Sequence, residues 1–231
     1  HDDSRKGDTG SGMLDRRTFL ISATAAIATG CSGNTTAKLP PKPSLTKPVS
    51  TDYVQMYAAR PQERFPIPAV DISKIDPKFY RQVVDYNSSA QPGSIVVETH
   101  ERFLYLAMGG GKAMRYGVGI GRDGFAWGGR ARIARKKAWP TWTPPADMIK
   151  RQPKLAKYKN GMNPGLDNPL GARALYIFEG NKDTLYRIHG TSETWSIGKA
   201  ASSGCVRMLQ QDVIDLYNRV PEGTPITVYQ V

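Results

Sequence analysis

Cysteine is almost absent from this chain of 231 residues, which holds only Cys31 and Cys205, and histidine occurs three times. Cys31 lies in an N-terminal segment whose composition differs from that of the remaining chain. The globular part therefore carries a single thiol and cannot form an internal disulfide. It contains two histidines, His100 and His189, which are far apart in the sequence. One thiol and two separated imidazoles make no metal-ligand cluster, and we expect neither a metal nor another cofactor.

Long hydrophobic runs are also lacking, because the apolar run at residues 21–28 is too short for an ordinary helix that spans a bilayer. The run follows the twin arginines Arg16 and Arg17 and a Phe-Leu pair, a pattern typical of a bacterial Tat export signal. Residues 28–31 then resemble a lipobox, in which Cys31 would be lipidated; a plain cleaved signal is the alternative. We expect export to the periplasm or cell envelope, with lipid at Cys31 as a membrane anchor.

Acidic residues are too few to balance the basic ones, since 20 Asp and Glu face 32 Lys and Arg and leave a formal charge of +12. Such an excess often indicates a nucleic-acid partner. An exported protein rarely meets nucleic acid, however, and no nucleic-acid-binding motif is present in the sequence. We therefore expect no nucleic-acid partner and favour anionic groups of the cell envelope.

The composition divides the chain into an N-terminal extension with a signal (1–31), a linker and lead-in rich in Pro, Lys, Ser and Thr (32–64), and one globular domain (65–231). Two helices are predicted, at Asp76–Asp85 and Met208–Val220. Six short segments have the composition of strands and are bounded by Gly, Pro or Asn; they are Ile95–Val97, Phe103–Ala107, Ala113–Val118, Ala174–Phe178, Thr184–Ile188 and Ile226–Tyr229. The sequence thus predicts a mainly β fold with a few helices.

Cys205 is the strongest candidate for a catalytic residue. A thiolate attacks carbonyls readily, and a nearby imidazole can take the thiol proton and return it to a leaving amine. Gly204, directly before it, allows a sharp turn whose amides, including that of Cys205, can point at an oxyanion. Apolar residues downstream recur at helical spacing, so we expect Cys205 just ahead of a helix whose positive end favours a thiolate. The alternative is a small buried cysteine that only packs.

His189 is the candidate base, because it ends the predicted strand Thr184–Ile188, where a side chain can be held over a cleft. His100 lies between two apolar runs, in the segment Glu98-Thr99-His100-Glu101-Arg102. This segment is predicted to be a hairpin turn, in which His100 is exposed to solvent.

The stretches Ile188-His189-Gly190-Thr191 and Ser202-Ser203-Gly204-Cys205-Val206-Arg207 resemble the signature of the YkuD-type (ErfK-like) L,D-transpeptidases, cysteine enzymes that act on peptidoglycan stems. Ser203 stands where most members carry a second histidine. Residues 115–119 and Asn168-Pro169-Leu170-Gly171 extend the resemblance, which covers about residues 91–231. The resemblance implies a β-sandwich, with Cys205 as nucleophile and His189 as general base and acid.

The resemblance also implies roles for neighbouring residues. The carbonyl of Gly190 would orient the His189 ring, and Arg207 would support the loop or meet a substrate carboxylate. An ion pair of Arg207 with Asp212 or Asp215 is the alternative. Ser202 and Ser203 would supply hydroxyls beside the thiol. In the proline-rich insert at 139–148, Trp139 and Trp142 could stack on substrate at the rim of the cleft or fill the edge of the core.

The function predicted in this way is acyl transfer from a tetrapeptide donor stem to an amine acceptor, which is a second stem or an envelope protein such as an outer-membrane protein or lipoprotein. With water as the acceptor, the enzyme would be an L,D-carboxypeptidase. A peptidoglycan-binding or tethering module without turnover is the alternative from another class. Stem peptides of peptidoglycan are the expected partners, and the cell envelope is the expected location.

Overall fold

The computed structural model describes residues 53–121, 127–202 and 204–230, and these residues form a mainly β fold, as predicted. The α-helices are α1 (Tyr53–Met56), α2 (Ala146–Arg151) and α3 (Gln210–Arg219). The 3-10 helices are η1 (Ile72–Lys74), η2 (Pro77–Phe79), η3 (Pro153–Tyr158) and η4 (Thr194–Ser196). Within the described ranges, no helix is both long enough and apolar enough to cross a membrane.

Nine strands form one sheet, in the order β1-β4-β3-β2-β11-β6-β7-β8-β10. Their bounds are β1 Gln82–Asp85, β2 Ile95–Glu98, β3 Phe103–Gly109, β4 Lys112–Gly117, β6 Gly129–Ala138, β7 Arg173–Glu179, β8 Lys182–Thr191, β10 Val206–Leu209 and β11 Pro225–Tyr229. Two short strands, β5 (Ile120–Gly121) and β9 (Ala200–Ser202), pair separately. All six strands predicted from the sequence are present.

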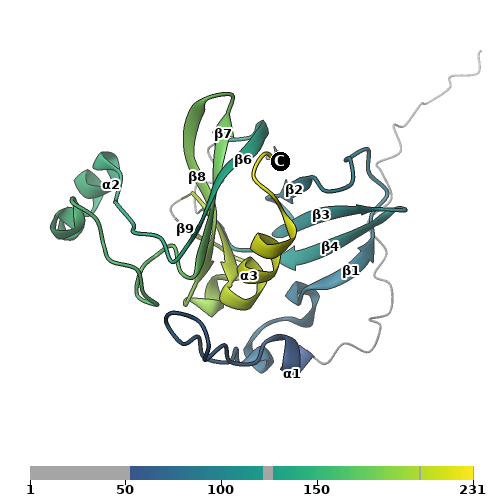
Figure 1. Cartoon of the computed structure of the whole chain (residues 1–231), viewed down its shortest axis with the longest axis horizontal. Coiled ribbons are helices and arrows are strands. Elements are labelled where there is room, and N and C mark those ends of the chain that lie inside the picture. The colour runs from purple at the N-terminus through teal and green to yellow at the C-terminus, as the bar shows by residue number, and fades with distance from the viewer. Residues whose placement is uncertain (1–52, 122–126, 203, 231) are drawn as a thin grey trace, which may run out of the picture. The chain divides into compact units, whose positions relative to one another are not determined.

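The two halves of the sheet pack around one core together with α3. In Figure 1, strands β1 to β4 lie on one side of α3, and β6 to β8 lie on the other. The main cluster joins buried side chains of both halves to the apolar face of the helix, among them Ile95, Leu104, Ile133, Leu175 and Leu216. The sandwich expected from the resemblance is therefore built from the two halves of one continuous sheet.

The predicted helix at Asp76–Asp85 is wrong. Pro77 begins the 3-10 helix η2, which ends at Phe79, and the chain then forms the edge strand β1. This strand pairs antiparallel with β4 and aligns Val84 with Ala113. The β-branched pair Val83-Val84 favours a strand, and hydrogen bonds along β4 decide the outcome.

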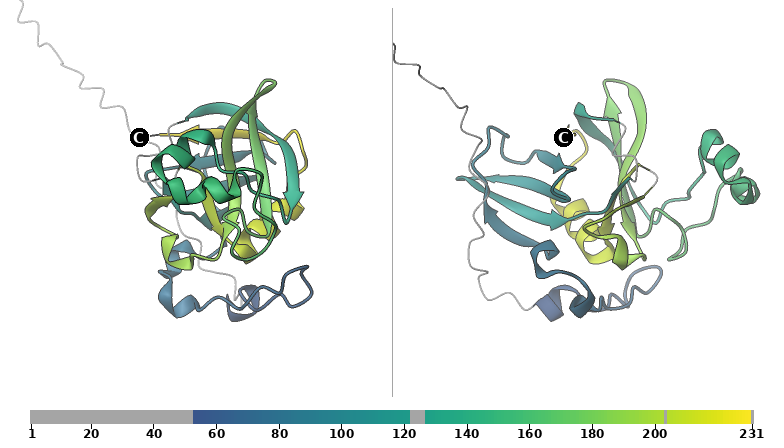
Figure 2. Two further views of the ribbon diagram at one scale, coloured as in Figure 1. Left: turned by 90° about the vertical axis from the view of Figure 1, so that its left-hand side faces the viewer. Right: turned by 180° about the vertical axis from the view of Figure 1, so that it is seen from behind.

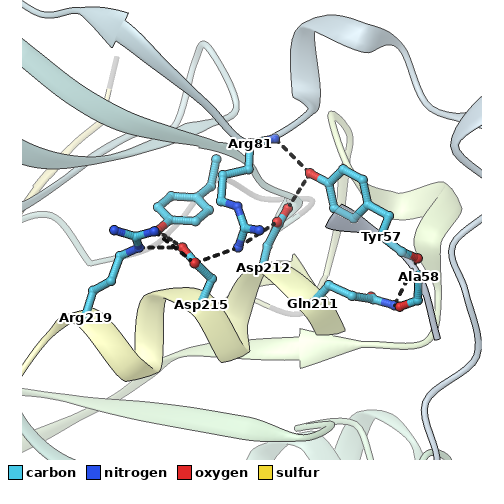
Figure 3. Close-up of polar contacts among 8 residues, drawn as sticks. Tyr57, Ala58, Arg81, Gln211, Asp212, Asp215 and Arg219 are labelled. Carbon is cyan, nitrogen blue, oxygen red and sulfur yellow. Dashed lines mark hydrogen bonds and ion pairs between the residues drawn. The ribbon is translucent and has the colours of Figure 1, made fainter. Parts of the chain in front are cut away.

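The folded part begins upstream of the boundary at residue 65 that we predict from the sequence. Tyr57 is only 1% exposed, and its hydroxyl donates to Asp212 Oδ2 over 3.1 Å and accepts from the amide of Arg81 over 2.7 Å. Arg81 also forms an ion pair with Asp215 at 3.0 Å (Figure 3). The Gln211 side chain donates to the carbonyl of Ala58. Residues 53–81 are therefore fastened to α3 and are not linker.

We predict that Tyr57→Phe destabilises the fold by about 1–3 kcal/mol, because it leaves the buried amide of Arg81 without an acceptor and removes a donor from Asp212. Burial already raises the pKa of Asp212 to about 7, so this carboxyl depends on its remaining partners. Urea unfolding measures the change. Tyr229→Phe, at a 48% exposed position, is the matched control and should leave the unfolding midpoint unchanged.

Candidate active site

Cys205 directly precedes strand β10, which pairs in parallel with β8. The register aligns Val206 with Ile188 and Arg207 with His189. The side chains of Ile188 and Val206 point into the core, where both are fully buried. Since side chains alternate across a strand, Cys205, His189 and Arg207 belong to the opposite face. Neighbouring strands lie about 4.8 Å apart, and two residues span about 6.6 Å along a strand. The backbone positions of Cys205 and His189 are therefore close enough for the two side chains to approach each other.

The expected helix directly after Cys205 is wrong, because α3 begins only at Gln210 and β10 lies between. Val206 and Leu209 fit a helical spacing, but Val206 and Met208 also fit the alternation of a strand, and pairing with β8 settles the choice. The positive end of a helix therefore does not act on this thiol.

Gly204 makes the turn that leads to Cys205. Its φ of +127° is a backbone conformation that other residues rarely adopt. A Cβ at this position would also lie 3.3 Å from the Tyr186 ring. The turn therefore requires glycine for its conformation and for its packing.

The ring of His189 is buried, with 5% of the residue exposed, and its Nδ1 lies 2.8 Å from the carbonyl oxygen of Gly190. This is the contact that the family resemblance implies. Because a carbonyl can only accept, Nδ1 carries the hydrogen, and Nε2 of the neutral ring is left as the basic nitrogen. Burial lowers the pKa of His189 to about 4, and the carbonyls of Gly190 and Pro169 oppose this shift only in part. The imidazole is therefore neutral at neutral pH.

Gln210, at the start of α3, supports the backbone on which the His189 ring rests. Its Oε1 accepts from the amide of Ala172 over 2.9 Å. Side chains at Gly171 and Gly190 would both collide with the Gln210 amide group, which fills the space that these glycines leave. The carbonyl that holds His189 is thus itself held by packing.

Two arginines lie near the thiol of Cys205. The backbone N–H of Arg187 donates to the sulfur, and the charges of Arg187 and Arg207 both favour a thiolate. Burial acts in the opposite direction and is the larger effect, so the pKa of the Cys205 thiol lies above its ordinary value. The lowered pKa of His189 and the raised pKa of Cys205 both favour an uncharged resting pair over a thiolate–imidazolium ion pair.

Arg207 pairs with Glu193, whose Oε2 accepts from Nη1 over 2.5 Å. The alternative partners predicted from the sequence are wrong. Asp212 hydrogen-bonds Tyr57, and Asp215 pairs with Arg219 and Arg81. Arg207 therefore lies beside His189, on the side of the sheet that carries the thiol, with a half-exposed carboxylate as its partner.

The sequence left two alternatives for the tryptophans of the insert, stacking on substrate or filling the edge of the core. Trp139 is only 6% exposed, packs edge-on against Phe65 and donates its indole N–H to Glu63, so it fills the edge of the core. Trp142 is half-buried against Leu170 and Tyr176. The Trp139 indole is therefore not an open platform for a ligand, whereas stacking of substrate on Trp142 stays a prediction.

The chain continues beyond the insert at 139–148 and forms α2 and η3, which stand away from β6 to β8 in Figures 1 and 2. The side chain of Asn168 joins the two ends of this excursion, because Nδ2 donates to the carbonyls of Pro140, Met162 and Asn163 and Oδ1 accepts from the amide of Leu170. The next residue along, Pro169, is the one whose carbonyl faces the His189 ring. Asn168 thus fixes both ends of this excursion of the chain next to the residue that contacts His189.

His100 lies exposed in the turn between β2 and β3, so the turn prediction is confirmed. Ser203, the signal at 1–31 and Cys31 lie outside the described residues, and the side chain of Ser202 is not described either. Across the part of the chain that the structure describes, no three His, Cys, Asp or Glu residues come together as a metal site.

Sequence reasoning missed several residues near the site, namely Arg187, Tyr186, Glu193 and Gln210. Arg187 pairs with Asp183 four residues before it, a spacing that the sequence does display. For Glu193 and Gln210 no local signal exists, because their partners come from other elements.

We predict that alkylation of Cys205 by iodoacetamide becomes steadily faster from about pH 6 to beyond pH 9. The thiolate is the reactive form, and a raised thiol pKa means that its population is still growing across this range. Peptide-resolved mass spectrometry separates Cys205 from Cys31, which serves as the internal comparison. A flat, fast rate down to about pH 5 would instead indicate a stable ion pair with the imidazole.

A family model described as the L,D-transpeptidase catalytic domain, YkuD, matches residues 92–228. The chain is 35% identical over 145 residues to the probable L,D-transpeptidase YbiS of Escherichia coli K12, an alignment that covers 58% of this chain and 43% of YbiS. It is 32% identical over 145 residues to the probable L,D-transpeptidase ErfK/SrfK of Salmonella typhimurium, covering 61% and 45%. The chain thus spans less than half the length of these curated relatives.

A solved structure from Brucella melitensis, described as a probable carnitine operon oxidoreductase, is 48% identical and covers 67% of this chain and 96% of its own. The superposition has a TM-score of 0.48, and the oxidoreductase description is that of the Brucella protein. The family model matches more than half of the residues, and the chain therefore belongs to the L,D-transpeptidase catalytic domain family.

Proposed function

We propose that the protein is a peptidoglycan L,D-transpeptidase that works through a covalent thioester on Cys205. The parallel register of β8 and β10 supports this proposal most directly, because it brings a lone thiol to the same face as a buried, neutral imidazole. The family model supports the substrate class, which is the peptide stem of peptidoglycan.

In the first half of the reaction, Nε2 of His189 takes the thiol proton while the sulfur attacks the carbonyl of the amide before the terminal D-amino acid. The same nitrogen returns the proton to the leaving amine, and the carbonyl carbon stays bound to sulfur as a thioester. A neutral imidazole with a free basic nitrogen suits this role, because the base must be unprotonated before the attack.

The negative charge that develops on the carbonyl oxygen needs donors. The amides of Gly204 and Cys205 lie in the turn that the positive φ of Gly204 creates, and we assign this task to them. The guanidinium of Arg207 is the candidate for a substrate carboxylate, because its pair with Glu193 is half-exposed and can exchange partners.

In the second half, an amine attacks the thioester, His189 takes its proton, and the sulfur leaves as the thiol. A stem amine gives a 3-3 cross-link, an envelope protein or lipoprotein gives a covalent attachment, and water gives the L,D-carboxypeptidase reaction. We favour an amine over water as the acceptor, since the related proteins YbiS and ErfK/SrfK are described as transpeptidases.

Incubation of the purified protein with a disaccharide-tetrapeptide, followed by mass spectrometry, tests the proposal. A cross-linked dimer with loss of one D-amino acid supports transpeptidation, whereas tripeptide alone supports the carboxypeptidase. Recovery of unchanged substrate, together with retention on purified sacculi, would instead support a binding module without turnover.

Ser203 occupies the position of a family histidine, and we propose that its hydroxyl and that of Ser202 assist substrate binding near Cys205. A neutral hydroxyl contributes roughly 1 kcal/mol when it is paired, so we predict that Ser203→Ala slows single-turnover acylation about tenfold or less. Ser203→His should be tolerated, because related enzymes carry that side chain there. Inactivity of Ser203→Ala at the level of a Cys205 variant would show that the thiol–imidazole mechanism is incomplete.

We also propose a location in the cell envelope, reached through the twin-arginine signal and held by lipid on Cys31. Fractionation tests this. Cys31→Ser should move the mature protein from the membrane fraction to the soluble periplasmic fraction, and replacement of Arg16 and Arg17 by lysine should block export. An unchanged membrane fraction for Cys31→Ser would exclude the lipid anchor.

A further inference from the structure

A hollow of about 210 Å³ lies on the segment that joins His189 to Cys205, next to the N-terminal lead-in. Its base is apolar and contains Ile75, Phe79 and Ile197. Gly198 also lines it, and a Cβ there would collide with the Phe79 ring, so the backbone packs directly on the aromatic side chain. The hollow is therefore a formed feature of the fold and not a gap between mobile side chains.

The rim of this hollow carries an exposed aromatic ring and two ammonium groups. Trp195 is 54% exposed, which makes it one of the few large apolar side chains left open to solvent among the described residues. Lys199 Nζ lies 5.6 Å from the centroid of the Trp195 ring. Lys74 is the second cation, and it forms an exposed ion pair with Asp71. Such a rim suits a ligand with an apolar face and a negative group.

One carboxylate, Asp76, also lines the hollow, but it already has partners. Its Oδ1 accepts from the amide of Lys78 over 3.0 Å, and its Oδ2 lies 3.3 Å from Lys78 Nζ. Asp76 is therefore paired with Lys78, and its charge does not neutralise the ammonium groups of Lys74 and Lys199 on the rim.

The hollow and the site lie close together in the sequence. Strand β9 begins at Ala200, directly after Lys199, and leads to Gly204 and Cys205. Lys199 and Cys205 are six positions apart in the sequence, so their Cα atoms are at most about 20 Å apart. The amide of Gly198 donates to Val118, and the carbonyl of Lys199 accepts from Ile120. These hydrogen bonds hold the rim residues Gly198 and Lys199 on the segment 118–120.

We infer that the hollow is a subsite for the glycan part of the substrate: the Trp195 ring stacks on an N-acetylated amino sugar, and Lys199 and Lys74 bind a carboxylate close to that sugar. This inference rests on the proposed function. An extended stem of three residues between the sugar and the amide at Cys205 spans about 10 Å, and the lactyl link adds to that length. The separation therefore lies in the range that the chain allows between the thiol and the hollow.

The test compares two donors that differ only in the sugar, a disaccharide-tetrapeptide and the free tetrapeptide. In Trp195→Ala, KM for the disaccharide-tetrapeptide should rise about tenfold, as expected for the loss of one good contact. Values for the free tetrapeptide should stay unchanged. Lys199→Ala should raise KM for both donors, because the carboxylate that it binds belongs to the stem that they share. Met108→Ala, at a 47% exposed apolar position on β3, and Lys182→Ala, at the exposed start of β8, are the matched controls. In Trp195→Ala, equal losses for both donors, or no loss for either, would overturn the subsite.

A binding measurement keeps the subsite separate from the reaction. Calorimetric titration of the Cys205→Ala protein with the disaccharide N-acetylglucosaminyl-N-acetylmuramic acid, which lacks a peptide, should show saturable binding. Adding Trp195→Ala should abolish it. If the wild-type protein processes neither donor, the proposed function fails, yet this titration still decides the subsite; absence of binding at millimolar disaccharide would overturn it.

Discussion

Replacing Cys205 with alanine is expected to abolish both the covalent acyl-enzyme and the processing of tetrapeptide stems, a fall of about four orders of magnitude or more. The change removes the sulfur that we assign as the nucleophile, and the described domain contains no second thiol that could replace it. The measurement is single-turnover reaction with a disaccharide-tetrapeptide, with the mass of the intact protein read at each time point.

The control for this change is the fold itself. The side chain of Cys205 is half-buried next to Tyr186 and Arg187, and alanine keeps its Cβ, so the urea midpoint should move little. Cys205→Ser adds a second test, because a hydroxyl keeps the shape of the thiol but ionises far less readily. A folded Cys205→Ala protein that still releases the terminal D-amino acid would end the assignment of Cys205 as nucleophile.

Replacing His189 with alanine is expected to lower the rate of acylation by about 10²- to 10⁴-fold, the range that a general base supplies. Burial raises the pKa of the thiol that remains, so the thiol depends on a base for its activation. His100→Ala, in the exposed β2–β3 turn, is the matched control and should leave the rate unchanged. Equal losses in the two variants would show that His100 has a role outside its turn.

The acid limb of the wild-type pH profile tests the same residue in another way. Only the unprotonated imidazole can accept the thiol proton, and burial lowers the pKa of His189 to about 4. On acidification, kcat/KM should therefore not fall with the ordinary histidine pKa near 6.5, but only as the pH approaches about 4. A limb centred near 6.5 would show that the site is wet, and that burial does not determine the state of this ring.

The sequence predicts the parts of the site that local chemistry determines. His189 lies towards the end of a strand, Gly204 makes a turn with a positive φ, and His100 lies in a hairpin turn, all from residue types and spacing within a few positions. The six strands could be predicted because strand-like composition and flanking turn residues are local signals that do not depend on the partner strand.

The elements that the sequence failed to predict depend on distant partners. Strand β6 reads as a basic segment, yet its Arg135 lies over the Tyr176 ring and Lys136 over the Tyr217 ring, so the long side chains pack on aromatic neighbours. The residues of β10 fit a helical spacing in the sequence, and pairing with β8 makes them a strand. Trp139 is fixed by Glu63, far earlier in the chain, and not by its proline-rich surroundings.

The order of strands also determines when this protein can fold during its synthesis. Strand β11, formed by Pro225–Tyr229, lies in the middle of the sheet, where it aligns Ile226 with Ile95 of β2 on one side and with Ala131 of β6 on the other. Until the ribosome has released these residues, the two halves of the sheet have no strand between them. Such distant pairing is slow and leaves apolar surface open meanwhile. A nascent chain stalled before Pro225 should therefore remain sensitive to protease along its whole length, and premature stop codons there should remove the protein from the cell.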